Sequence, residues 1–95
     1  MVKQMKVFQS SSFARKVKKM QPAEKTDLDQ VIRALINNPL IGIENRGDLK
    51  GIFIYKFKLR KRDYLLAYRA CSDNSLELIM IGPHENYYRD LKGYL

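Results

Sequence analysis

The sequence predicts an α+β fold in two layers: an N-terminal strand, a helical hairpin, a three-stranded antiparallel meander and a short C-terminal helix. Two patterns indicate this fold. Apolar residues recur at helical spacing up to residue 38, and they alternate with polar residues from residue 52 onward. The helical hairpin is expected to cover one face of the sheet and to leave the other face partly open. A chain of 95 residues is expected to form one domain, spanning 1–95.

The N-terminal half predicts one strand and two helices. Residues 2–8 are interpreted as a strand at or near a sheet edge, and the serines at 10–12 are candidate N-caps for the first helix. Pro22 suits the first turn of the second helix, and Pro39 ends that helix because it disfavours a helical residue before it. The expected buried positions of the two helices are Phe13, Val17 and Met20, and Leu28, Val31, Ile32, Leu35 and Ile36.

The stretch from residue 52 to residue 71 carries the strongest functional signal. One side of its first strand is apolar, and the other side holds Lys56, Lys58 and Arg60. Residues 61–63 are interpreted as a polar break and residues 64–71 as a second strand. Residues 76–81 are interpreted as a third strand, and their apolar run predicts a central place in the sheet. Three cations in a file suit a polyphosphate backbone. A solvated strand face explains the same pattern equally well.

Composition and charge restrict the partners. The net charge is +8 and the pI is near 9.7, which indicates a polyanionic partner: nucleic acid, an acidic protein or an anionic membrane surface. No apolar run approaches the roughly 20 residues that cross a bilayer, and no signal peptide is evident, so a cytoplasmic location and no membrane partner are expected. Cys71 is the only cysteine, and its place in a strand pattern predicts a small buried thiol.

His84 is the only histidine, and it follows the end of the third meander strand. Such a residue can serve as a general acid or base. Tyr88 lies four residues on and would share a helix face with it, while Asp63 at the hairpin tip could orient an imidazole or simply close a turn. A surface or capping histidine is the alternative. No carboxylates have the spacing of metal ligands, so neither a metal nor another cofactor is expected.

Taken in order, these features resemble the RelE/ParE superfamily of bacterial toxins from type II toxin–antitoxin systems, over nearly the whole chain. The segments that carry the resemblance are Asn38-Pro39, residues 47–51 (Gly-Asp-Leu-Lys-Gly), Lys58-Leu59-Arg60, residues 63–68 (Asp-Tyr-Leu-Leu-Ala-Tyr) and residues 82–88 (Gly-Pro-His-Glu-Asn-Tyr-Tyr). The last two are similar to stretches of the YafQ branch of that superfamily. The resemblance implies the RelE-like fold and a neutralising antitoxin, expected to contribute an acidic or amphipathic helical segment.

RelE-like members cut mRNA, usually on the ribosome, by driving a ribose 2′-hydroxyl onto the adjacent phosphate without a metal. The roles that this implies are catalysis for His84, Tyr88, Lys56, Lys58 and Asp63, and RNA phosphate binding for Arg60, Lys61, Arg62 and Lys50. The chain departs from both known catalytic sets. Leu65 and His84 stand where RelE has arginines, and Leu59 stands where the YafQ branch has a histidine.

Two other functions remain open at this stage. The same fold serves ParE-like toxins, which inhibit DNA gyrase by binding and carry out no catalysis. A nucleic-acid-binding domain, or a toxin disabled by substitution, would show affinity for RNA or DNA that falls with salt, and no cleavage. The histidine facing a cationic strand favours the ribosome-dependent mRNA endonuclease.

Overall fold

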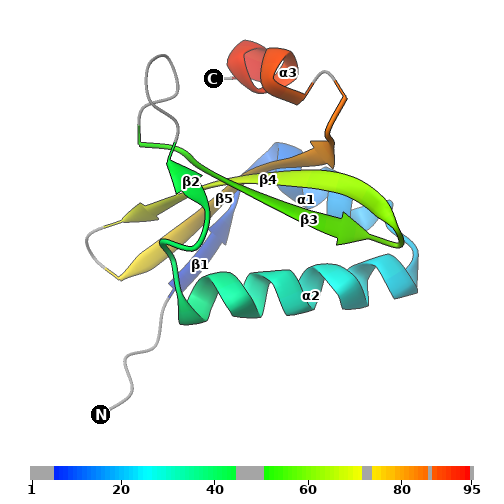
Figure 1. The fold of residues 1–95 in the computed structure, drawn as a ribbon, viewed down its shortest axis with the longest axis horizontal. Helices are drawn as coiled ribbons and strands as arrows, with labels where there is room; N and C mark the ends of the chain where they lie inside the picture. The colour runs from blue at the N-terminus through cyan, green and yellow to red at the C-terminus, as the bar shows by residue number, and fades with distance from the viewer. Residues whose placement is uncertain (1–5, 45–50, 72–73, 86, 95) are drawn as a thin grey trace.

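The computed structural model of the chain describes residues 6–44, 51–71, 74–85 and 87–94. Helices and strands follow one another in a mixed order (Figure 1). The elements are β1 (Lys6–Gln9), α1 (Ser11–Lys18), α2 (Pro22–Asn37), β2 (Ile43–Glu44), β3 (Phe53–Leu59), β4 (Arg62–Cys71), β5 (Ser75–Pro83) and α3 (Tyr87–Tyr94). The predicted α+β element order is therefore confirmed.

The strands form one five-stranded sheet in the order β1-β5-β4-β3-β2. Strands β3, β4 and β5 form the predicted antiparallel meander, because short turns join them. Strand β1 pairs in parallel with β5 at one edge, which the crossover through α1 and α2 makes possible. The two-residue β2 pairs antiparallel with β3 at the other edge.

Side chains and backbone groups define where the first two helices begin. The Ser10 hydroxyl accepts from the Phe13 backbone N–H (3.0 Å), so Ser10 is the N-cap of α1. The Gln21 backbone N–H donates to Glu24 Oε1 (2.8 Å), and Pro22 occupies the first turn of α2 as predicted. Helix α2 ends at Asn37, just ahead of Pro39.

The larger core lies between α1 and α2 and the sheet face that carries Phe57 and Leu59. Phe13, Leu28 and Leu35 from the helices are buried here, as their spacing predicted. The remaining buried members of this core are Leu66, Tyr68, Leu76, Leu78 and Ile81. The prediction that the helical hairpin covers one sheet face is confirmed.

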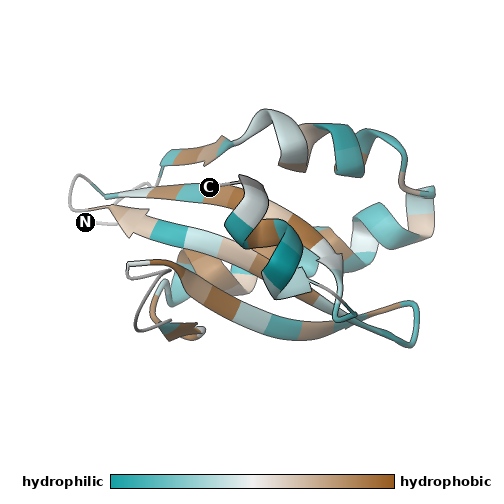
Figure 2. Ribbon diagram, turned by 90° about the horizontal axis from the view of Figure 1, so that it is seen from above, coloured by the Kyte–Doolittle hydropathy of each residue, from teal (hydrophilic) through white to brown (hydrophobic). Residues whose placement is uncertain are grey.

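A second, smaller core lies on the opposite face, under α3. Tyr87 and Leu91 of α3 are 1% and 0% exposed and pack on Ile52, Ile54, Leu65, Ala67 and Ile79. Figure 2, viewed from this side, shows α3 lying across part of the sheet. The face that was expected to be partly open is thus covered by α3 in its middle and exposed where Lys56 and Lys58 lie.

A bulge in β5 attaches helices on both faces of the sheet. The β4–β5 register shifts after Ala67, which pairs with Met80 while Tyr68 pairs with Leu78. The carbonyl of Ile79 accepts from the Ser10 hydroxyl at the start of α1. The carbonyl of Met80 accepts from the Tyr87 hydroxyl of α3 (2.6 Å). Both helices are therefore hydrogen-bonded to the same irregularity in β5.

Two burial predictions are wrong, because Ile36 is exposed near the end of α2 and so is Cys71. Cys71 is the last residue of β4, beyond the stretch that the helices cover, so the strand pattern predicted burial where the layer above has ended. None of the described helices is long and apolar enough to span a bilayer.

Replacing Tyr68 with phenylalanine is expected to lower the free energy of unfolding by about 1–3 kcal/mol. The Tyr68 hydroxyl donates to the Pro39 carbonyl (2.8 Å) and accepts from the Gly42 N–H (2.9 Å), so it joins the segment after α2 to the sheet. Its loss leaves both backbone groups without this partner. Urea unfolding measures the change, with Tyr88→Phe on the exposed side of α3 as the control. Equal midpoints for the two variants would contradict the prediction.

Candidate active site

The β3–β4 hairpin closes through two residues only, Arg60 and Lys61, whose φ angles are 49° and 72°. This is the left-handed conformation that a tight hairpin of two residues requires. Strand β4 therefore begins at Arg62, and the polar break predicted at 61–63 is too long. The correction matters because Asp63 becomes a strand residue directly opposite Lys58.

Three ionisable residues lie in a row across the ends of three adjacent strands. Lys58 Nζ is 3.0 Å from Asp63 Oδ1, across the β3–β4 pair. The His84 backbone N–H donates to the Asp63 carbonyl (3.1 Å), which places His84 beside Asp63 at the end of β5. With about 4.8 Å between strands, the row from Lys58 to His84 spans roughly 10 Å.

Lys56 lies on the same sheet face as this row, two residues before Lys58. It pairs with Leu65, which in turn pairs with Gly82. Residues two apart in a strand are separated by roughly 6–7 Å, about the spacing of successive phosphates in a polynucleotide. The predicted site residues Lys56, Lys58, Asp63 and His84 are therefore brought together, and we refer to these four as the strand-end cluster.

The charges of the strand-end cluster are linked. The hydrogen bond from Lys58 and the positive charge of Lys58 lower the pKa of the Asp63 carboxyl, and Lys56 and His84 add to the effect. Asp63 is thus held as a carboxylate. The Lys58 side chain is 70% exposed, so its ammonium remains accessible while it is paired. An ammonium has three N–H donors, and Asp63 occupies one of them.

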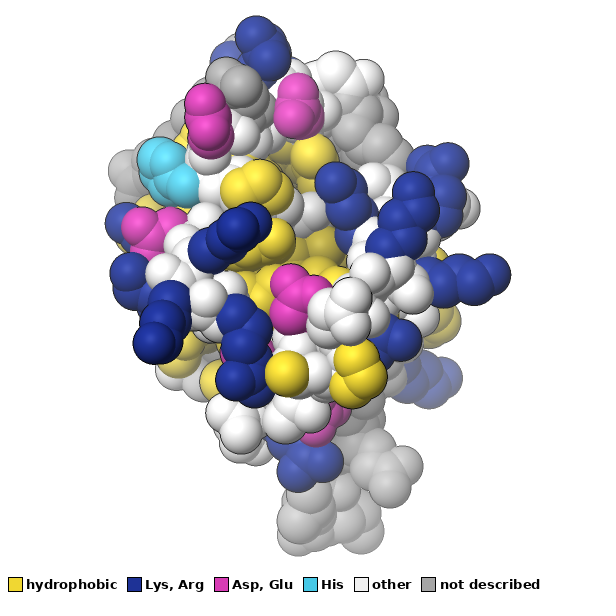
Figure 3. Space-filling model, turned by 90° about the vertical axis from the view of Figure 1, so that its right-hand side faces the viewer, with side chains coloured by type: hydrophobic (Ala, Val, Ile, Leu, Met, Phe, Trp, Pro, Cys, Tyr) yellow, Lys and Arg dark blue, Asp and Glu magenta, His cyan; other side chains and the backbone are white. Residues whose placement is uncertain are grey.

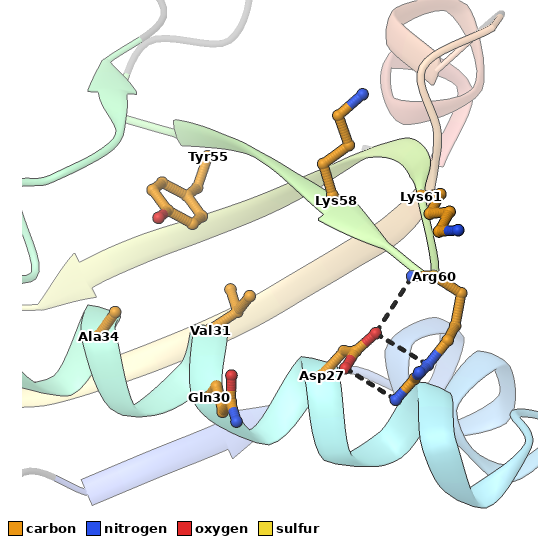
Figure 4. Close-up of a pocket in the computed structure, with 8 residues that line it drawn as sticks. All are labelled: Asp27, Gln30, Val31, Ala34, Tyr55, Lys58, Arg60 and Lys61. Atoms are coloured by element: carbon orange, nitrogen blue, oxygen red, sulfur yellow. Dashed lines mark hydrogen bonds and ion pairs between the residues drawn. The ribbon is translucent and has the colours of Figure 1, made fainter.

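Arg60 does not lie in file with the two lysines, contrary to the prediction. Strand alternation ends at Leu59, and the turn directs Arg60 to the other side of the sheet, toward α2. Its Nε is 3.1 Å from Asp27 Oδ2, and its Nη2 donates to Asp27 Oδ1 (3.2 Å) and to the Ala23 carbonyl (3.1 Å). Figure 4 shows Arg60 bent toward Asp27 while Lys58 points away from α2.

The sequence did not reveal the role of Asp27 in the turn. Its carboxylate also accepts from the Arg60 backbone N–H (3.1 Å), so one residue of α2 holds both the backbone and the side chain of the turn. A non-glycine residue in the left-handed region is uncommon. We call these contacts of Asp27 with Arg60 the hairpin clamp. The hairpin clamp offsets the conformational cost of the left-handed turn and fixes the turn that brings Lys58 and Asp63 together.

The other predicted phosphate-binding residues are divided between the two sheet faces. Arg62 pairs with Leu59, a residue buried under the helices, so Arg62 belongs to the helix-side face. Lys61 lies in the turn itself. Lys50 lies outside the described residues. Figure 3 shows lysines and arginines around a hydrophobic centre at this end of the molecule, with the histidine on one flank beside acidic side chains.

His84 and Tyr88 do not share a helix face, which corrects the prediction from their spacing. His84 precedes α3 in a bend, and its carbonyl accepts from the Tyr87 backbone N–H (3.3 Å) where the helix begins. Tyr88 is 42% exposed and meets the ring of Tyr87 edge-on, with ring centres 5.9 Å apart. Its exposed ring lies on the helix that covers the face of the strand-end cluster.

The fold is expected to lose stability in alkaline solution through Tyr87. Burial raises the pKa of the Tyr87 phenol well above its usual value, although the Ala67 backbone partly opposes the shift. A raised phenol pKa stabilises the fold fully below the unfolded-state pKa of about 10 and loses that contribution as pH rises toward the folded-state pKa. Urea unfolding between pH 8 and about 11 measures the decline. The decline should be shallower in Tyr87→Phe, and an identical slope would contradict it.

Comparison with known proteins identifies the family of the chain. A family model described as ParE-like toxin of type II bacterial toxin–antitoxin system matches residues 7–92. Among curated proteins, none matches the sequence.

Several solved structures share the fold. The isolated E. coli RelE toxin is 20% identical, with 97% of this chain and 100% of that chain covered and a TM-score of 0.68. A chain of the intact E. coli RelBE toxin–antitoxin complex is 17% identical, with 86% of this chain and 99% of that chain covered and a TM-score of 0.69. A chain of the RelBE2 toxin–antitoxin complex from Mycobacterium tuberculosis is 21% identical, with 84% and 98% covered and a TM-score of 0.65. The chain therefore belongs to the ParE-like toxins of type II bacterial toxin–antitoxin systems, within the RelE/ParE superfamily.

Proposed function

We propose that this toxin is an endoribonuclease that inhibits translation by cutting mRNA on the ribosome, in the cytoplasm, without a metal. The observation that carries the proposal is the strand-end cluster, in which Lys58, Asp63 and His84 form a row beside Lys56 on an exposed sheet face. Two cations and an imidazole around one carboxylate suit phosphoryl transfer, which depends mainly on positioning and charge stabilisation. The proposed partners are mRNA and the ribosome.

The proposed reaction is an internal transfer at one phosphate. The ribose 2′-oxygen attacks phosphorus, the bond to the 5′-oxygen of the next nucleotide breaks, and the products are a cyclic phosphate and a 5′-hydroxyl. One proton leaves the 2′-hydroxyl and one reaches the 5′-oxygen. We assign proton transfer to His84, and charge stabilisation of the pentacoordinate phosphate to Lys56 and Lys58.

Asp63 acts in this scheme by positioning. Because its pKa is lowered, its carboxylate is a weak proton acceptor, and it holds Lys58 next to His84 instead. An exposed ion pair of this kind is screened by water and contributes little to stability. A phosphate can therefore approach the Lys58 ammonium without a large cost from the pair with Asp63.

The remaining residues are proposed to hold the RNA on either side of the scissile phosphate. The exposed ring of Tyr88 can stack on an unpaired base, as aromatic side chains do in single-strand recognition. Lys61, Arg62 and Lys50 are proposed to contact flanking phosphates. Arg60 would join them only after release from Asp27, so we assign it chiefly to the hairpin clamp.

A second candidate function is inhibition of DNA gyrase by binding. The observation that favours it is the family model itself, which describes ParE-like toxins. If the toxin inhibits gyrase, the strand-end cluster contacts gyrase or DNA through charge alone, and no covalent bond is broken.

Primer extension on a defined mRNA in a translation extract distinguishes the two functions. Cuts that appear only when the message is translated are expected if the toxin acts on the ribosome. Intact message together with continued protein synthesis would overturn the nuclease proposal. Inhibition of supercoiling by purified gyrase, tested in parallel with the same preparation, would then support the second candidate.

We also propose that a cognate antitoxin binds this chain. Support comes from the family and from the two similar complexes, which are toxin–antitoxin assemblies. A basic toxin with net charge +8 favours rapid association with an acidic partner. Co-expression with the protein encoded by the neighbouring reading frame should restore growth and yield a stable complex, and failure of both would contradict this proposal.

A further inference from the structure

The edge of the sheet formed by β3 is open along most of its length. Strand β2 pairs with β3 only through Ile43 with Ile54 and Glu44 with Phe53. From Tyr55 to Leu59 the outer edge of β3 has no pairing strand among the residues that the structure describes. An exposed strand edge of this kind is a template for another strand unless it is blocked.

The hairpin register identifies which backbone groups face outward. Leu59 and Arg62 flank the two-residue turn and form the hydrogen-bonded pair that closes it. Hydrogen-bonded and non-hydrogen-bonded pairs alternate along an antiparallel ladder, so Phe57 and Tyr55 also direct their backbone groups toward β4. The N–H and C=O groups of Lys56 and Lys58 therefore point to the open edge.

A groove of about 470 Å³ runs beside this edge, between β3 and α2. Figure 4 shows it between Tyr55 and Lys58 of the strand and the facing turns of the helix. Its lining residues from α2 are Asp27, Gln30, Val31 and Ala34, and those from the hairpin are Tyr55, Lys58, Arg60 and Lys61. Asp27 is paired with Arg60. Lys58 and Lys61 lie at the rim of the groove, and Lys58 stays 70% exposed although it is paired with Asp63.

The opposite end of the same edge is apolar. Leu40, Ile41 and Ile43 are 68%, 42% and 79% exposed, and Ile43 pairs with Ile54 just where the open part of β3 begins. Exposed large apolar residues that gather beside an unpaired strand edge are typical of an interaction site. Along the edge, the surface therefore changes from apolar at Ile43 to basic at Lys58.

We propose that an extended acidic segment of a protein partner adds as a strand to the open edge of β3, next to Lys56 and Lys58. Apolar residues of the segment would cover Ile43 at one end. A peptide is favoured over RNA because the edge offers alternating donors and acceptors, which match another backbone, whereas phosphate accepts only. Identification of the segment with an antitoxin rests on the proposed toxin–antitoxin pairing.

Such a strand would also neutralise the strand-end cluster. Side chains on neighbouring strands share a face when they are directly opposite, so acidic residues of the added strand would lie across from the Lys56 and Lys58 side chains. The same segment would then occupy the sheet edge and cancel the charge that the proposed nuclease needs.

Amide hydrogen exchange of the full chain, followed by NMR, tests this directly. The probe is a capped hexapeptide of alternating valine and glutamate at millimolar concentration, compared with a valine–lysine peptide and a single-stranded RNA hexamer. Of the three probes, only the acidic peptide should slow exchange at the Lys56 and Lys58 amides. Unchanged exchange at both amides with the acidic peptide, or slowing with RNA instead, would overturn the proposal.

Two variants at one position separate the backbone from the side chain. Lys56→Ala removes the side chain beyond Cβ and keeps the backbone N–H, whereas Lys56→Pro also removes the outward N–H, which an edge strand tolerates. One hydrogen bond corresponds to about 2- to 10-fold weaker peptide binding for the proline variant than for the alanine variant. Equal affinities would overturn the backbone contact. If Lys56→Pro does not fold, exchange in the unaltered chain decides.

This readout is independent of RNA cleavage. A chain that binds the acidic peptide at the β3 edge but leaves translated mRNA intact would retain this inference and lose the nuclease proposal. A chain that cuts mRNA but shows no protection at the Lys56 and Lys58 amides would retain the nuclease proposal and lose this inference.

Discussion

Replacing both Lys56 and Lys58 with alanine is expected to lower the rate of mRNA cleavage by about 100- to 1,000-fold, the typical effect of removing preorganised charge from a transition state. The two ammonium groups lie on one face of β3, and both act on the Asp63 carboxylate. Neither side chain supports the core, because both are exposed. The loss should therefore appear in the rate of cleavage and not in folding.

Single-turnover cleavage of a ribosome-bound message measures this effect. Lys25→Ala/Arg33→Ala is the matched control, since it removes two exposed cations from α2 and so has the same net charge as Lys56→Ala/Lys58→Ala. The control should keep most of its activity if local geometry matters. A similar loss in both double variants would indicate that net charge drives the effect through RNA or ribosome binding.

Replacing His84 with alanine is expected to lower cleavage by about 100- to 10,000-fold, the range for loss of a general acid or base. His84 is exposed at the end of β5, and its backbone N–H, not its imidazole, makes the contact with Asp63 that continues the sheet. The alanine variant keeps that backbone contact, so its unfolding midpoint should be close to that of the unaltered toxin.

Added imidazole provides the sharper measurement for His84. Partial recovery of single-turnover cleavage in His84→Ala, but not in Lys56→Ala/Lys58→Ala, is expected if the side chain transfers a proton. Glu85→Ala, one residue along on the same exposed segment, is the control and should cleave normally. Full activity of His84→Ala would remove the histidine from the proposed mechanism.

The exposed residues, more than the fold, determine which molecule this toxin acts on. The RelE-like structures share the fold at 17–21% identity, and one fold carries different activities when its exposed residues differ. The target therefore depends on the side chains of the strand-end cluster, which is why both large-effect predictions concern them.

Periodicity was enough to predict most of the fold. The spacing of Phe13, Leu28 and Leu35 identified the helix faces, and alternation along β3 placed Phe57 and Leu59 in the core and Lys56 and Lys58 outside it. These patterns are local, since a helix or a strand repeats its orientation every 3.6 or two residues whatever it packs against. The resemblance to the RelE/ParE superfamily was then confirmed by the family model.

Only the tertiary structure decided how the site is assembled. Alternation predicted Arg60 beside Lys58, but the two-residue turn ends the strand at Leu59, and Asp27 on α2 binds the arginine on the other face. Spacing likewise placed His84 and Tyr88 on one helix, whereas α3 begins only at Tyr87. In both cases the outcome depends on where an element ends and which distant residue contacts it, and a local repeat contains neither piece of information.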